Sequence, residues 1–129
     1  MIGEIVRKWV ERADLDLLSA KRLLEDGIYE YSLFHSQQAV EKYLKAFLAK
    51  NQVKFGKTHN IARLIELCKT IDKDFEYLFD IKADKLYPKG IDVRYPEFEY
   101  EISEEDAREA LEIAEKARDF VLKKLREQQ

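Results

Sequence analysis

The 129-residue sequence contains one cysteine, two prolines and four glycines. The single cysteine, Cys68, excludes an internal disulfide, and its apolar helical surroundings favour a small buried hydrophobe over a nucleophile. The shortage of glycine and proline leaves few tight turns, which argues against a β-sandwich or a β-barrel. No apolar run reaches the roughly 18 residues of a membrane-spanning helix, and the N-terminus is charged from Glu4 onward. We therefore expect a cytoplasmic protein without a membrane contact.

The formal net charge of −3 predicts no affinity for nucleic acid, but the charges are distributed unevenly. Between Lys42 and Ile65 there are six cations and no acid, whereas between Glu97 and Asp119 ten acids stand against three cations. Two interpretations remain open. The cations could form a basic patch that binds anions, or the two segments could be solvated helix faces that attract each other. Abundant Lys, Glu, Ile and Tyr with few Asn and Gln are typical of a thermophile.

Apolar residues recur at helical spacing in two long segments near the N-terminus. The pattern over Glu4–Glu25 advances in steps of four and three residues, which predicts a helix packed in a bundle and ended by Asp26 and Gly27. A second stripe predicts a helix over Tyr29–Lys50, built on Leu33, Val40, Tyr43, Leu44 and Phe47. Because only a short link joins the two segments, we expect an antiparallel hairpin.

Cap residues predict two further helices in the middle of the chain. Thr58 is expected to cap a helix over residues 59–69. His59 would then occupy the first helical position, where unsatisfied backbone N–H groups favour a neutral imidazole. Asp72 is expected to cap a fourth helix, which would run from Lys73 to about Leu86.

The C-terminal part of the chain combines a loop with a long helix. Residues 87–102 contain both prolines and are too apolar for disorder, so we expect an ordered loop strapped across the bundle. Ser103 and Asp106 predict a capping box for a last helix that runs to about Arg126. The expected fold is all-α: one domain over residues 1–129, an up-and-down bundle of four to five helices with a long ordered loop before the last one.

The segment Tyr29–Lys50 also carries a polar face on which alanines alternate with polar residues. His35, Gln38, Lys42 and Lys45 are spaced by three, four and three residues, so they share one ridge. Small residues between polar ones predict that another surface comes close. If that surface is a second copy of the chain, a homodimer would form along a seam of Ala39, Ala46 and Ala49. The structural alternative is a histidine hydrogen-bonded in a helix interface beside ordinary polar surface.

Several kinds of active site have no counterpart in the sequence. There is no phosphate-cradling glycine loop, no Cys/His metal spacing and no glycine-flanked serine nucleophile. Two histidines cannot complete a structural metal site, so neither a metal nor a cofactor is expected. Asp14 and Asp16 lie two positions apart, cannot share a helix face and are interpreted as surface charges or cap residues. His35, His59 and Arg94 remain as candidates, although Arg94 could equally pin its loop through a salt bridge.

The sequence resembles the HEPN domain, the higher eukaryote and prokaryote nucleotide-binding domain, in DLDLLSAKRLLEDGIYEYSLFHSQQAVEKYLKAFLAKNQV, KTHNIARLIELC and DVRYP. The resemblance spans nearly the whole chain from Asp14 onward. It is most specific in SQQAVEKYLKA, in the TH that follows and in the late RYP. It implies an up-and-down helical bundle, a homodimer and a link to nucleotides or RNA. Many small prokaryotic members are similar partners of a separately encoded minimal nucleotidyltransferase, commonly as toxin and antitoxin.

Nuclease members of that family carry an arginine followed by a histidine after about four to six residues. After Arg94 the three corresponding positions hold Glu99, Tyr100 and Glu101. The resemblance therefore implies a nucleotide-binding or interaction module that partners a nucleotidyltransferase and lacks the usual nuclease pair. Its binding residues would be His35, Gln38, Lys42, His59, Arg94 and Tyr95.

Two alternatives remain. The first is a metal-independent ribonuclease with a rearranged site of either His59 or His35 together with Arg94, in which the histidine moves protons and the cation stabilises phosphate charge. The second is RNA binding by the cationic stretch from Lys42 to Arg63 alone.

Overall fold

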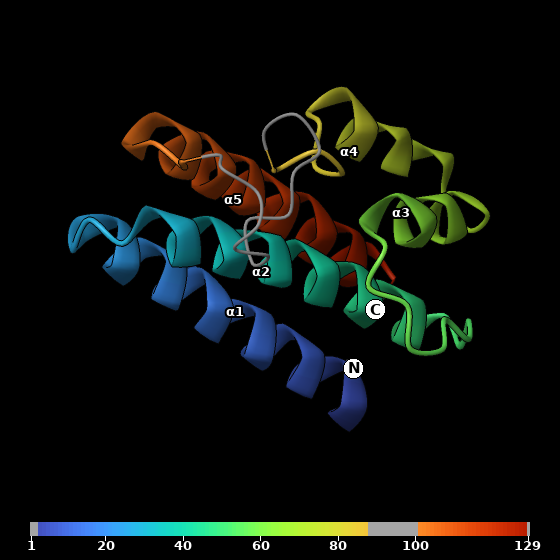
Figure 1. Cartoon of the computed structure of the whole chain (residues 1–129). Helices are drawn as coiled ribbons and strands as arrows, with labels where there is room; N and C mark the ends of the chain where they lie inside the picture. Colours follow the sequence, from blue (N-terminus) through green and yellow to red (C-terminus); the bar gives the residue numbers. More distant parts are fainter. Residues whose placement is uncertain (1–2, 88–100, 129) are drawn as a thin grey trace.

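The structure is a computed structural model that describes residues 3–87 and 101–128 (Figure 1). In these ranges the chain is all-helical and contains no strand, which confirms the predicted fold class. The elements are α1 (Glu4–Glu25), α2 (Tyr29–Lys50), α3 (Ile61–Lys69), η1 (Lys73–Phe75, a 3-10 helix), α4 (Glu76–Asp80) and α5 (Glu104–Glu127).

The first two helices begin and end at the predicted residues and form the expected antiparallel hairpin (Figure 1). Gly27 makes the turn between them with a φ of +77°, a left-handed conformation that costs glycine little. The turn is closed by the backbone N–H of Ile28, which donates to the carbonyl of Leu23 at 2.9 Å. A local signal of two residues, Asp26 and Gly27, was therefore enough to predict the hairpin.

Helix α2 is the centre of the bundle (Figure 1). It packs most extensively against α1, next against α5, and then against α3. Its buried residues include two charged ones, Glu41 and Lys45. Cys68 of α3 is fully buried beside α2, as predicted for a small hydrophobe, and this burial raises the pKa of its thiol.

Helix α3 begins two residues later than predicted. Its N-cap is Asn60, whose side chain accepts a hydrogen bond from the backbone N–H of Arg63 at 3.1 Å. Thr58 instead accepts from the backbone N–H of Asn60 at 3.1 Å and stabilises the turn before the helix. His59 therefore lies ahead of α3, so the prediction that it occupies the first helical position is wrong.

The fourth helix is shorter than predicted. Asp72 caps η1, which leads directly into α4, by accepting from the backbone N–H of Asp74 at 2.9 Å, but α4 ends at Asp80 rather than near residue 86. Lys82 adopts a φ of +63°, and the N–H of Ala83 donates to the carbonyl of Leu78 at 2.9 Å. This is the hydrogen-bond pattern of a helix C-terminus. It turns the chain so that Ala83 and Leu86 are buried against the bundle.

Helix α5 begins with the predicted capping box. Ser103 accepts from the N–H of Asp106 at 3.1 Å, and the Asp106 carboxylate accepts from the N–H of Ser103 at 3.0 Å. The loop predicted to cross the bundle, with Arg94 and Tyr95, lies outside the described residues apart from its two ends. Among the helices that the structure describes, none is both long and apolar enough to cross a membrane.

Candidate functional site

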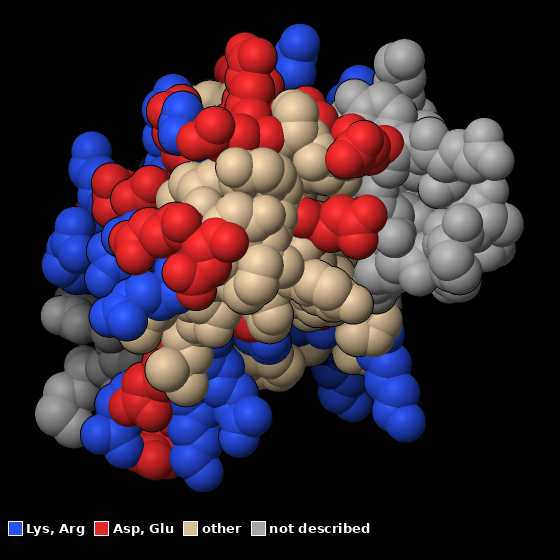
Figure 2. All heavy atoms as spheres, turned by 60° about the vertical axis from the view of Figure 1, so that its left-hand side comes forward, with Lys and Arg blue, Asp and Glu red and all other residues tan. Residues whose placement is uncertain are grey.

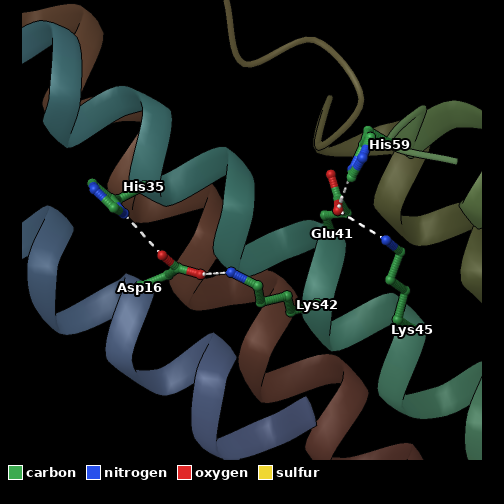
Figure 3. A network of polar contacts seen from close by, with 6 residues as sticks. All are labelled: Asp16, His35, Glu41, Lys42, Lys45 and His59. Carbon is green, nitrogen blue, oxygen red and sulfur yellow. Dashed lines mark hydrogen bonds and ion pairs between the residues drawn. The ribbon is translucent and has the colours of Figure 1, made fainter. Parts of the chain in front are cut away.

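The polar ridge of α2 faces a carboxylate of α1 (Figure 3). His35 Nδ1 lies 2.8 Å from Asp16 Oδ1, and Lys42 Nζ donates to the other oxygen, Oδ2. The Asp16 side chain is only 12% exposed, whereas those of His35 and Lys42 are 30% and 24% exposed. One nearly buried carboxylate therefore holds a histidine and a lysine side by side at the surface.

This contact selects which nitrogen of His35 faces away from the pair. An ionised carboxylate accepts hydrogen bonds only, so Nδ1 carries a proton, and Nε2 is an acceptor in the neutral ring and a donor in the protonated ring. The ring also packs edge-on against Phe34, with ring centroids 5.3 Å apart and an interplanar angle of 79°. His35 is thus oriented by two neighbours, and its second nitrogen remains available to a ligand.

A second cluster lies on the opposite side of the ridge (Figure 3). Glu41 Oε2 accepts from Lys45 Nζ at 3.0 Å and lies 2.9 Å from His59 Nδ1. The Glu41 and Lys45 side chains are 4% and 6% exposed, but that of His59 is 76% exposed. Lys45 Nζ also lies 5.5 Å and 5.6 Å from the ring centroids of Trp9 and Phe55. This cluster fastens the loop before α3 to the bundle, because His59 and Phe55 both belong to that loop.

A third cluster joins three helices and is structural. Tyr43 donates its hydroxyl to Asp14 Oδ1 at 2.5 Å, and Arg118 Nε donates to the same oxygen at 3.0 Å. Burial, followed by the hydrogen bond with Asp14, raises the pKa of Tyr43. The phenol is therefore a neutral donor, and the cluster ties α1, α2 and α5 together.

The structure sorts the predicted site residues into separate places. His35 and Lys42 share one carboxylate, whereas Lys45 and His59 share another. Gln38 is half-buried between His35 and Lys42 along α2. Two of the six cations of the basic stretch, at positions 42 and 45, are thus already paired within the chain.

Sequence reasoning missed the carboxylates that organise these clusters. Asp16 falls on the apolar stripe of α1 at positions 13, 16, 17 and 20, and Glu41 falls on that of α2 at positions 41, 44 and 48. A carboxylate at a stripe position predicts a buried acid that needs a partner, and this signal was available. The interpretation as a plain surface charge is therefore wrong for Asp16, whereas Asp14 is 42% exposed and is held by Tyr43 and Arg118.

The expected dimer seam needs a correction as well. Ala39 and Ala46 are fully buried within the chain, and only Ala49 remains half-exposed. Ala39 lies one turn from both His35 and Tyr43, each of which contacts an aspartate of α1. The small residues do permit a close helix approach, but the neighbour is α1. At Ala39 and Ala46 there is no free surface for a second copy.

Charge segregation is visible on the surface. The acids of α5 are exposed in its first half, at Glu104, Glu105, Glu109 and Glu112. Figure 2 shows the face that includes the end where α5 begins, and carboxylates gather there around uncharged surface with cations toward the margins. An anionic ligand would be repelled from this end. Among the described residues, no group of three or more His, Cys, Asp or Glu side chains is arranged to hold a metal ion.

Comparison with known proteins gives evidence about the family of this chain that is independent of the site geometry. A family model described as the HEPN domain matches residues 6–125. A Methanocaldococcus jannaschii protein named a putative toxin is 33% identical over an alignment of 133 positions that covers 92% of this chain and 87% of that protein. The crystal structure of an archaeal HEPN homologue is similar with a TM-score of 0.65 and 27% identity, covering 92% and 96% of the two chains. A Thermus thermophilus crystal structure is similar with a TM-score of 0.65 and 28% identity, covering 95% and 99%.

Proposed function

The chain belongs to the HEPN domain family, and on this premise we propose that it is a nucleotide-binding and interaction module that pairs with a nucleotidyltransferase. The relative named a putative toxin supports a toxin–antitoxin setting for the pair. A homodimer remains part of the proposal, with an interface away from the buried alanines. Residues 1–129 act as one such domain.

The observation that carries the binding proposal is the Asp16, His35 and Lys42 cluster. Lys42 uses one of its ammonium protons on Asp16 and retains others for a ligand. The second ring nitrogen of His35 faces away from Asp16 and donates to an anion when the ring is protonated, and Gln38 adds an amide one turn from both. Charge-assisted hydrogen bonds from such groups are the usual means of binding phosphate. The phosphate of a nucleotide would therefore lie over the Asp16 side of the ridge.

The set of residues that could contact this phosphate is wider than the cluster itself. Arg94 and Tyr95, which lie outside the described residues, belong to the proposal as further nucleotide contacts. His59 belongs to it less directly, because its Nδ1 is held by Glu41 in the second cluster. The proposal thus depends chiefly on His35 and Lys42.

Calorimetric titration with AMP, ATP, GMP and GTP tests the binding site. We expect dissociation constants in the micromolar range or weaker. His35→Ala and Lys42→Ala should each weaken binding about tenfold, because each removes one charge-assisted hydrogen bond worth roughly 1.5 kcal/mol. Lys54→Ala and Lys57→Ala are matched controls, since both remove exposed charges away from the cluster and should leave affinity within about twofold. Flat heats with all four nucleotides would rule out this site.

A second candidate function is a metal-independent ribonuclease, which the orientation of His35 by Asp16 favours. Nε2 of His35 would take the proton of an RNA 2′-hydroxyl, whose oxygen attacks phosphorus while the 5′-oxygen leaves with a proton from water. Lys42 would stabilise the phosphate charge. Cleavage of a labelled tRNA pool should then be lost in His35→Ala and fall about 100-fold or more in Asp16→Asn. Cleavage that survives both His35→Ala and His59→Ala would show that neither histidine is the catalyst.

A further inference from the structure

A groove outside the histidine clusters lies between the η1–α4 segment and the C-terminal half of α5. Its volume is about 590 Å³, which falls within the range of small-molecule sites. It is lined by aromatic and charged side chains, namely Lys73, Asp74, Glu76, Tyr77, Asp80, Phe120, Lys123 and Lys124. The proposed function makes no use of this groove.

The floor of the groove is the outer end of a series of aromatic rings. The series starts at the fully buried Phe47, whose ring centroid lies 4.3 Å from that of Phe75. Phe120 follows at 5.0 Å from Phe75, and Tyr77 at 5.1 Å from Phe120 with an interplanar angle of 32°. Tyr77 is 37% exposed, so one ring surface remains uncovered. The packed rings beneath hold that surface in place, which lowers the ordering cost for a flat ligand.

Some charged side chains around the floor of the groove form ion pairs with described residues, and others do not. Lys124 contacts both Asp72 and Asp74, and these hydrogen bonds raise the pKa of Lys124. Glu76 is paired with Lys69 at 2.9 Å. Lys73, Lys123 and Asp80 are exposed and form no ion pair with any other described residue. The groove therefore offers two free cations and one free carboxylate around an exposed aromatic ring.

From this arrangement we infer a second binding site, in which a purine base stacks on Tyr77 while the phosphate of the same nucleotide contacts Lys73 and Lys123. The exposed part of Tyr77 can stack with a planar ring, and the two lysines can bind an anion that a flexible link joins to this ring. Asp80 can accept a hydrogen bond from the edge of the same ring. A purine nucleoside monophosphate can make all three contacts, since stacking on an aromatic side chain tolerates any base and a ring amino group can donate to Asp80. This site is separate from His35 and Lys42, and neither site depends on the other.

Two-dimensional amide NMR of the whole chain, titrated with AMP and GMP, locates binding directly. We expect shifts at residues of α4 and of the C-terminal half of α5. Tyr77→Ala should weaken the affinity that these shifts report about tenfold or more, because the stack is lost, whereas Tyr77→Phe should retain it. Lys73→Glu with Lys123→Glu should weaken it similarly through charge reversal. Ribose 5-phosphate, which has no base, should bind this groove at least about tenfold more weakly than AMP.

The result separates this site from the one at His35. Shifts at the groove that persist in His35→Ala with Lys42→Ala support the second site even if the proposed function fails. Shifts confined to α1 and the His35 side of α2 would overturn the second site and leave the proposed function standing. The inference is also overturned if groove shifts survive in Tyr77→Ala, or if only a single-stranded oligoribonucleotide, and neither mononucleotide, produces them.

Discussion

Ala46→Arg is expected to unfold the protein, not to separate a dimer into monomers. Ala46 has no exposed surface and lies one turn from Lys42 and Tyr43, both of which contact aspartates of α1. An arginine there would either bury a charge without a partner or force the two helices apart. Either outcome costs more than about 4 kcal/mol, a large part of the roughly 5–15 kcal/mol that keeps a domain folded. Urea unfolding followed by circular dichroism measures the loss.

Ala49→Arg provides the matched control for this prediction. Ala49 lies one turn further along α2 and is partly exposed at the edge of the core, so an arginine there can extend into solvent and should change the unfolding free energy by less than about 1 kcal/mol. Light scattering of this variant also reports whether a dimer uses that end of the ridge. An Ala46→Arg protein that folds with nearly normal stability would contradict the packing of α1 on this face.

Lys45→Met is expected to destabilise the protein by about 3–5 kcal/mol. The substitution preserves side-chain length but leaves the Glu41 carboxylate buried without its ammonium partner, and it removes a cation that lies over two aromatic rings. His59 still contacts Glu41, but its own side chain is largely solvated and compensates little. Thermal and urea unfolding measure the change.

Lys69→Met separates the effect of burial from the effect of losing a lysine. Lys69 also pairs with a glutamate and lies over a ring, that of Phe79, but its partner Glu76 is half-exposed. The same substitution there should cost less than about 1 kcal/mol. The double variant Glu41→Leu with Lys45→Met should recover part of the lost stability, because removing both charges leaves neither unpaired. Equal losses in Lys45→Met and Lys69→Met would contradict the buried pair.

Local signals explain which helix ends were predicted. The ends of α1 and α2 follow from apolar periodicity and from Asp26 and Gly27, all within one or two turns of the boundary. The start of α3 offered two competent caps, Thr58 and Asn60, and local preference could not choose between them. The end of α4 depends on the burial of residues 83 and 86 against other helices, which no local pattern encodes.

Only part of the candidate site was predicted, because local patterns place residues on one helix but do not pair them with residues of another helix. His35, Gln38 and Lys42 stood out because polar residues on one ridge of a long helix are visible in a sequence. The sequence could mark Asp16 as an acid on an apolar stripe but could not pair it with them, because Asp16 lies 19 residues from His35 and 26 from Lys42, on a different helix. Asp16 and Glu41 each lie on an apolar stripe, where a buried carboxylate needs a cation or a hydrogen-bond donor as partner.

Helix order, the hairpin of α1 and α2, the capping box of α5 and the all-α class follow from interactions between residues a few positions apart, so the amino-acid sequence contains them directly. The sequence does not determine which neighbour each helix face contacts. Periodicity assigns residues to a face but not to a neighbour, because the apolar stripe of a helix does not specify which other helix covers it. Packing alone turned the alanine face of α2 toward α1 and set His35 and Lys42 on one carboxylate of α1, with Lys45 and His59 on another within α2.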